Sequence, residues 1–129
     1  MNIAAVILLT ATTMLFAGCV QQDGEQSYPS VTPEELYSML SSGEDIFLLD
    51  VHIPEQKHIP GTDAFIPYNQ IKRHADLLPQ DRSAKIVVYC RSGPMSFPAM
   101  NALREMGYTN VYYLEGGILA WKNAGYPVP

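Results

Sequence analysis

Two short apolar segments limit the folds open to this 129-residue chain: DIFLLDV at 45–51 and KIVVYC at 85–90. Each is a continuous apolar run, which is typical of a strand buried on both faces of a sheet. Shorter strands are predicted at 64–66 and 110–114. Helical spacing of apolar residues predicts helices at 33–42, 68–78, 96–106 and 117–124. Because strands alternate with helices, we predict an α/β fold with a mainly parallel central sheet flanked by helices on both faces.

The first predicted helix carries boundary signals at both ends. Thr32 is a good N-cap residue, Pro33 suits the first helical position, and Glu35 would complete a capping box. Gly43 is predicted to end the helix.

Composition and cysteine count exclude several classes of function. Apolar residues make up 47% of the chain, which is enough to build a core. Eight Lys and Arg residues face 13 Asp and Glu, and they form no basic cluster, so no nucleic-acid partner is expected. Cys19 and Cys90 are too few for a disulfide scaffold or a four-ligand zinc site. Their spacing also excludes a C-x-x-C redox motif.

Residues 1–18 have the pattern of a signal peptide that is removed on export. The apolar run at 3–16 is shorter than the roughly 20 residues that span a bilayer. Ala17-Gly18-Cys19 follows it and resembles the lipobox of bacterial lipoproteins, in which the cysteine is lipidated after cleavage. An uncleaved anchor helix and a plain secretory signal are the alternatives. We therefore expect an exported lipoprotein, anchored in a membrane through Cys19 and facing the periplasm or the cell surface.

The expected lipidation bears on the second cysteine. Residues 19–28 comprise the lipidated Cys19 and a polar tether, and residues 29–129 are the predicted folded domain. Once Cys19 is lipidated, Cys90 has no disulfide partner, and a lone thiol in an oxidising compartment must be either buried or used. A Cys19–Cys90 disulfide in an unprocessed chain is the alternative.

The surroundings of Cys90 predict a nucleophile. Cys90 ends a buried strand, and a helix is predicted to begin near Ser96. Ligands of parallel sheets bind at this edge, beyond the carboxyl ends of the strands. Loop N–H groups, the helix N-terminus and Arg91 would all favour the thiolate over the thiol. A buried, inert thiol is the alternative.

Four motifs follow one another along the chain. They are DV at 50–51, HIPG at 58–61 with IP at 66–67, CRSG at 90–93, and LEGGILAW at 114–121 with GYP at 125–127. In this order they resemble a single-domain rhodanese, a member of a sulfurtransferase family. The resemblance covers about residues 29–129.

The resemblance implies sulfur transfer through a persulfide on Cys90. The donor would be a small sulfur-containing anion such as thiosulfate or polysulfide, and the acceptor a thiol or cyanide. The substrate and the persulfide would be held by a loop whose backbone N–H groups stabilise negative charge: Arg91, Ser92, Gly93, Pro94, Met95 and Ser96. No metal and no organic cofactor are implied, because the cysteine itself carries the sulfur. A monomer is expected.

Three side chains outside the loop are candidates for the pocket rim or its support. Asp50 is expected to bind backbone N–H groups near the strand end, and His58 to brace its own loop. His52, which stands where the family motif has arginine, is expected either at the pocket rim or simply at the surface.

Two further positions depart from the family pattern. Met95 replaces an arginine that many family loops carry, and Pro94 removes one N–H group. These changes keep open a non-catalytic alternative, a persulfide carrier or protein-binding module. A cysteine phosphatase or arsenate reductase would need arginine at the position of Ser96, which this chain lacks.

Overall fold

The computed structural model describes residues 28–129. The predicted signal peptide at 1–18, the lipidation at Cys19 and the tether up to residue 27 lie outside the described residues. Tyr28, predicted as the last tether residue, packs its ring against Phe97 with 4.6 Å between centroids and hydrogen-bonds Asn101. The folded part of the chain therefore includes Tyr28. None of the helices within 28–129 is long and apolar enough to cross a membrane.

The centre of the fold is a five-stranded parallel sheet with the strand order β1-β5-β4-β2-β3. The strands are β1 (Ser30–Val31), β2 (Phe47–Asp50), β3 (Ala64–Phe65), β4 (Ile86–Tyr89) and β5 (Val111–Leu114). The register pairs Asp50, at the end of β2, with Tyr89, at the end of β4. The segments that follow these two strands therefore leave the same edge of the sheet side by side.

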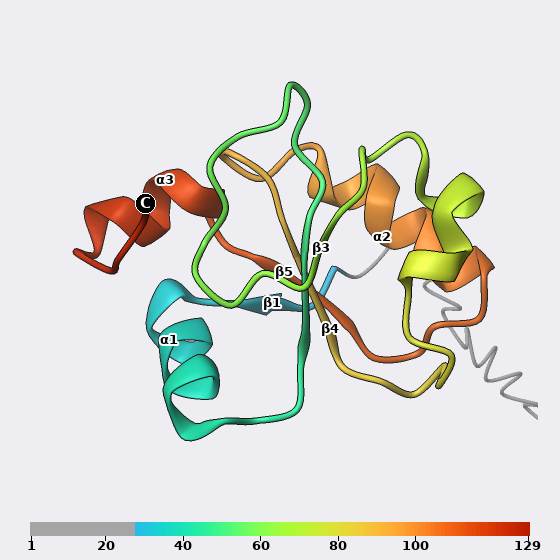
Figure 1. The fold of residues 1–129 in the computed structure, drawn as a ribbon, viewed down its shortest axis with the longest axis horizontal. Helices are drawn as coiled ribbons and strands as arrows, with labels where there is room; N and C mark the ends of the chain where they lie inside the picture. The colour runs from blue at the N-terminus through green and yellow to red at the C-terminus, as the bar shows by residue number, and fades with distance from the viewer. Residues whose placement is uncertain (1–27) are drawn as a thin grey trace, which may run out of the picture.

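Helices cover both faces of the sheet, as the sequence predicts. They are α1 (Pro33–Ser42), the 3₁₀ helix η1 (Ile71–Leu77), α2 (Ser96–Glu105) and α3 (Gly117–Asn123). Figure 1 shows α1 and α3 on one side of the strands and α2 on the other. Leu36 of α1 and Trp121 of α3 share a core with Leu48 and Val87, while η1 and α2 bury the opposite face. The predicted α/β class with a parallel sheet is confirmed.

The sequence and the structure differ in two elements. Apolar spacing predicts a helix over 68–78, but the segment forms only the shorter 3₁₀ helix η1, which is kinked at His74. Ile71 and Leu78 are buried whereas Ala75 is exposed, so the expected apolar stripe is not continuous. Strand β1 was not predicted, because two residues carry no periodicity and its pairing depends on β5.

The predicted boundaries of α1 are confirmed. The Glu35 N–H donates to Thr32 Oγ1 at 3.1 Å, and the backbone is left-handed at Gly43, with φ 72°. The Thr32 hydroxyl in turn faces the Glu35 carboxylate at 3.3 Å.

Candidate active site

Cys90 lies directly beyond β4 and is almost fully buried, with 1% of its surface exposed. Its Sγ accepts a hydrogen bond from the Gly93 N–H at 2.9 Å. Gly93 has a φ of 133°, a conformation that favours glycine, and this lets the loop turn back toward the sulfur. The loop thus presents a backbone dipole to the atom that would carry negative charge as a thiolate.

The rest of the loop differs in part from the cradle that the sequence predicts. Among residues 28–129, the Gly93 N–H is the only one hydrogen-bonded to Sγ. The Ser96 N–H instead donates to the Gly93 carbonyl at 3.0 Å, closing the turn that starts α2. Ser96 is buried, Met95 is half-buried, and Arg91, Ser92 and Pro94 are exposed.

The N-terminus of α3 holds the first two residues of the loop. The Ile118 N–H donates to the Cys90 carbonyl and the Leu119 N–H to the Arg91 carbonyl, each at 3.0 Å. This close approach requires glycine at 117, since a Cβ there would lie 2.5 Å from the carbonyl carbon and oxygen of Arg91. Gly117 of the LEGG motif therefore lets α3 approach the loop closely and hold the position of the cysteine.

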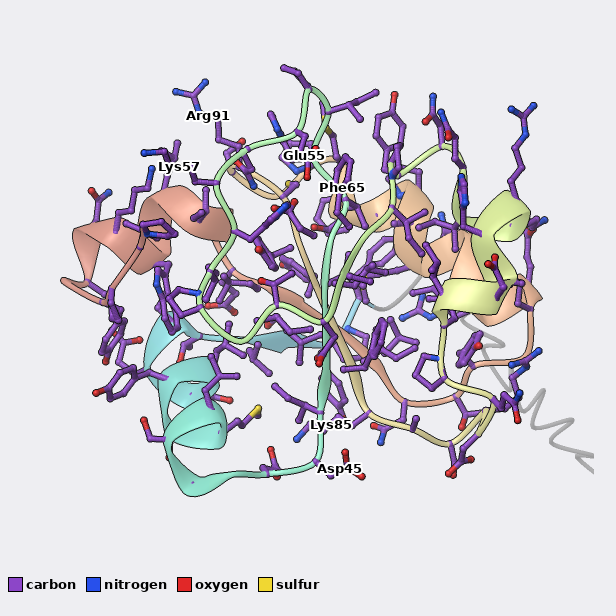
Figure 2. The ribbon with its side chains drawn as sticks, viewed as in Figure 1. Asp45, Glu55, Lys57, Phe65, Lys85 and Arg91 are labelled. Carbon is purple, nitrogen blue, oxygen red and sulfur yellow. The ribbon has the colours of Figure 1, made fainter. Side chains whose placement is uncertain are left out.

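A small pocket opens beside the sulfur. It has a volume of about 140 Å³ and is lined by His52, Cys90, Arg91, Ser92, Pro94 and Met95. That volume suits a small anion or the end of a thiol. A larger pocket of about 640 Å³ includes Asp45 and Lys85 in its lining, but it holds no cysteine and lies away from Cys90. Figure 2 shows Asp45 and Lys85 at the opposite edge of the molecule from Arg91 and Glu55.

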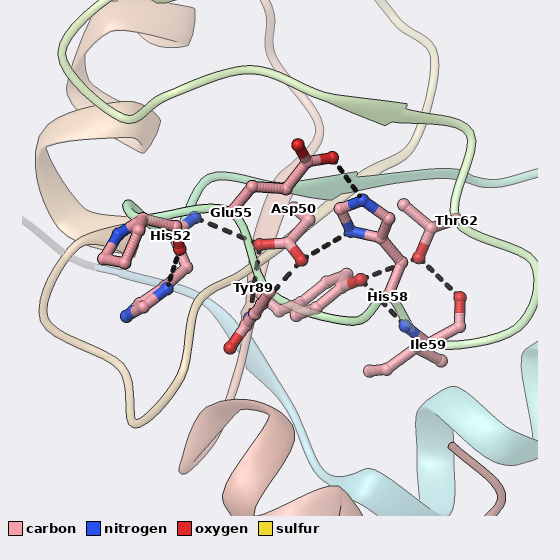
Figure 3. A network of polar contacts seen from close by, with 9 residues as sticks. Asp50, His52, Glu55, His58, Ile59, Thr62 and Tyr89 are labelled. Carbon is pink, nitrogen blue, oxygen red and sulfur yellow. Dashed lines mark hydrogen bonds and ion pairs between the residues drawn. The ribbon is translucent and has the colours of Figure 1, made fainter. Parts of the chain in front are cut away.

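Asp50 is the buried centre of a polar network beside this pocket (Figure 3). Its Oδ1 accepts the His52 N–H at 3.0 Å, and its Oδ2 lies 2.8 Å from His58 Nδ1. The amide of Gln56 lies 3.3 Å from both oxygens. Asp50 therefore binds a backbone N–H as expected, and it also joins the loop that follows β2 into one unit.

His58 bridges two carboxylates. Its Nδ1 faces Asp50, and its Nε2 faces Glu55 Oε1 at 2.9 Å. Carboxylates accept hydrogen bonds, so both ring nitrogens are donors when both bonds form, which requires the charged imidazolium. Burial acts to lower the pKa of His58, but the hydrogen bonds to Asp50 and Glu55 outweigh it and raise the pKa above its ordinary value. His58 thus braces its loop, as the sequence predicts.

The raised pKa of His58 predicts a pH-dependent stability. The folded protein holds this proton more tightly than the unfolded chain. The stabilisation is therefore complete at a pH below the pKa of His58 in the unfolded chain, about 6.5. The stabilisation is lost as the pH rises through the higher pKa that His58 has in the folded protein. Urea unfolding at a series of pH values is expected to show wild-type stability falling over this range and His58→Gln lacking that fall. An identical slope in both proteins would contradict the assignment.

Tyr89 links the end of β4 to the HIPG loop. Its hydroxyl oxygen accepts the Ile59 N–H at 3.0 Å and lies 2.7 Å from Thr62 Oγ1. The Thr62 hydroxyl donates to the Ile59 carbonyl at 2.6 Å, so the Tyr89 hydroxyl is the donor to Thr62. Burial raises the pKa of Tyr89 and keeps the phenol neutral.

The replacement Tyr89→Phe is expected to lower the free energy of unfolding by about 1–3 kcal/mol, because the Ile59 N–H loses its partner. Denaturant melts of the two proteins measure this difference. Tyr112→Phe, at a half-buried position of β5, is a control for the loss of a hydroxyl. An equal loss of unfolding free energy at the two positions would show that the hydrogen bonds of the Tyr89 hydroxyl do not stabilise the fold.

Sequence reasoning missed part of this network. It singled out Asp50, His52 and His58, and the structure brings all three together at the edge of the sheet near Cys90. It did not identify Glu55 or Tyr89. The loop that contains Glu55 has no periodic pattern, and Tyr89 reads as an ordinary core residue of an apolar strand.

The sequence of this chain is similar to those of rhodanese-like domains. The sequence pattern of the rhodanese-like domain family matches residues 32–124. The chain is 38% identical over 113 residues to the probable adenylyltransferase/sulfurtransferase MoeZ of Mycobacterium tuberculosis, covering 82% of this chain but 28% of that protein. It is 37% identical over 102 residues to a sulfurtransferase of Allochromatium vinosum, covering 76% of this chain and 92% of the relative.

A solved structure shows the same arrangement. The rhodanese-related protein of Thermoplasma volcanium superposes with a TM-score of 0.66 at 30% identity. The match covers 79% of this chain and 98% of that one. The fold neighbours therefore agree with the sequence relatives.

Proposed function

We propose, from the premise that this chain belongs to the rhodanese-like domain family, that it is a sulfurtransferase that works through a persulfide on Cys90. The observation that carries the proposal is the 2.9 Å hydrogen bond from the Gly93 N–H to Cys90 Sγ, at a pocket of about 140 Å³. A thiolate needs such a donor, and a small pocket admits the end of a sulfur donor while covering the rest of the cysteine.

The reaction has two displacement steps. The Cys90 thiolate attacks the outer sulfur of thiosulfate, a Cys90 S–S bond forms, and sulfite leaves with the electron pair of the broken bond. An acceptor nucleophile, a thiolate or cyanide, then attacks the outer sulfur and releases the Cys90 thiolate. Polysulfide can replace thiosulfate in the first step, with a shortened polysulfide as the leaving group. The cysteine returns to its starting state, so sulfur is carried without metal or organic cofactor.

The loop supports an anionic donor more weakly than a loop with two arginines would. Arg91 lines the pocket and is exposed, and Figure 2 shows its side chain directed outward from the edge of the molecule. Met95 supplies no second charge. A single exposed charge is strongly screened by water, so we expect weak binding of a dianionic donor such as thiosulfate.

The proposal includes a place of action, for which the support is sequence alone. The apolar run at 3–16 followed by Ala17-Gly18-Cys19 would export the chain and anchor it through Cys19. A monomeric domain would then carry out sulfur transfer at the periplasmic face of a membrane or at the cell surface.

Turnover assays test this function. The protein is incubated with thiosulfate or polysulfide and then with cyanide or a dithiol, and thiocyanate or sulfide is measured over time. Repeated turnover by the wild type and none by Cys90→Ser is the expected result. Loading of Cys90 without turnover by any acceptor would support the carrier alternative. Absence of both from a folded protein would reject the proposal.

A further inference from the structure

We propose that His52 is the general base that deprotonates a neutral thiol acceptor, so that this site is adapted to pass sulfur to thiols. The inference rests on the proposed function and deepens it, because it concerns the second half of the same reaction. His52 and Cys90 line one pocket. The β2–β4 register explains this closeness, since it pairs Asp50 with Tyr89 and the two segments run on together from there.

The hydrogen bonds of His52 fix which ring nitrogen can act. Nδ1 lies 2.7 Å from the Pro54 carbonyl oxygen, and a carbonyl only accepts, so Nδ1 carries the hydrogen. In the neutral ring Nε2 then holds the lone pair. Nε2 has no hydrogen-bond partner within residues 28–129, and in Figure 3 it makes none of the dashed contacts. It is therefore available to a ligand.

The backbone of His52 is also held in place. Its N–H donates to Oδ1 of the buried Asp50, which is tied in turn to His58. A base must be positioned before the reaction, and here both its main chain and its ring are fixed by bonds to other groups. Within residues 28–129, the other ionisable side chains lining the pocket are Cys90 and Arg91, so His52 is the only imidazole there.

The proposed step balances in protons and electrons. Nε2 takes the proton of the acceptor thiol, and the resulting thiolate attacks the outer sulfur of the Cys90 persulfide. The S–S bond breaks, its electron pair returns to Cys90 Sγ, and the product leaves as a hydropersulfide anion. The imidazolium releases its proton to water. While it is charged it offsets the repulsion between the incoming thiolate and the anionic persulfide. An arginine at this position could supply charge but could not accept the proton.

This role is tested by comparing acceptors that need a base with acceptors that do not. The wild-type protein is first loaded with sulfur from polysulfide, and loading is measured before excess donor is removed. Transfer is then timed for sulfite, which carries no proton at mildly alkaline pH, and for thiols whose pKa lies above or below the assay pH. If the wild type does not load at all, the proposed function fails before His52 is tested.

His52→Asn is the principal variant, because its amide can still donate to the Pro54 carbonyl in place of Nδ1. It is expected to slow transfer to weakly acidic thiols by roughly 100-fold, the lower end of what a positioned base contributes. Transfer to sulfite, transfer to thiols already ionised and loading from polysulfide are expected to slow much less than transfer to weakly acidic thiols, since none of these steps needs a base. His74→Gln in η1, away from the pocket, controls for loss of an imidazole.

His52→Arg separates a base from a charge. We expect it to accept sulfur from polysulfide and to remain slow with weakly acidic thiols. Recovery of thiol transfer in His52→Arg would overturn the proposal and assign a purely electrostatic role. Equal slowing of sulfite and thiols in His52→Asn, or no slowing of either, would overturn it as well.

Discussion

Replacing Gly117 with alanine is expected to remove sulfur transfer and to lower the free energy of unfolding by about 2–5 kcal/mol. The new Cβ would lie 2.5 Å from the carbonyl carbon and oxygen of Arg91 and 2.6 Å from the carbonyl oxygen of Cys90. These are backbone atoms, so α3 or the loop must move. Left-handed φ strain adds about 1–2 kcal/mol to an overpacking cost of about 1–3 kcal/mol. Any shift breaks the bonds from Ile118 and Leu119 that fix the cysteine.

Gly43→Ala is the matched control for this prediction. Gly43 has a similar φ of 72°, but its Cβ would meet nothing within 4 Å. It should therefore show the φ strain alone, about 1–2 kcal/mol, with sulfur transfer unchanged. Urea melts and turnover assays on both variants separate the two effects. If Gly117→Ala behaves like Gly43→Ala, the close packing of α3 on the loop does not matter for function.

Replacing Asp50 with alanine is expected to cost about 3–5 kcal/mol of stability, the range seen when one partner of a buried ion pair is removed. Asp50 is fully buried, and its removal leaves both the His52 N–H and His58 Nδ1 without their acceptor. The rim of the pocket would lose its support, so sulfur transfer should fall by about tenfold or more even where the variant is folded. Denaturant melts and turnover under stabilising conditions measure the two losses.

Asp50→Asn distinguishes charge from hydrogen bonding. The amide oxygen can still accept the His52 N–H, so the rim should keep its position and most of its activity. The raised pKa of His58 should nevertheless move back toward the ordinary value, since that shift depends partly on the charge of Asp50. An unchanged His58 titration in Asp50→Asn, followed by NMR, would show that Asp50 is not its partner in solution.

Much of the fold was predictable from sequence because the central strands carry a strong local signal. The short, continuous apolar runs in β2 and β4 are typical of buried strands, and Thr32 and Gly43 mark the ends of α1. The error at 68–78 arose because Ile71 and Leu78 fit helical spacing while the exposed Ala75 between them does not extend the buried stripe. Spacing alone does not distinguish an α-helix from a short 3₁₀ helix with a buried residue at each end, Ile71 and Leu78.

The site was predictable where it follows from strand ends. Cys90, Asp50 and His52 each stand at or just beyond the end of a buried strand, and a parallel sheet brings those ends together. Two features needed coordinates. The contact of Glu55 with His58 depends on the path of an irregular loop, and the approach of Gly117 to Arg91 depends on how α3 meets the sheet. The sequence also predicted more backbone N–H groups around the sulfur than the structure has. The Ser96 N–H, for example, donates to the Gly93 carbonyl in the turn that precedes α2.

The most direct test of the central claim is the mass of the Cys90 peptide after reaction with a sulfur donor. The reduced protein is incubated with polysulfide and, separately, with thiosulfate, then digested and weighed before and after addition of cyanide. The account predicts one added sulfur atom on Cys90 that cyanide removes, with none in Cys90→Ser. A folded protein whose Cys90 stays accessible to alkylating reagents but gains no sulfur from either donor would contradict it.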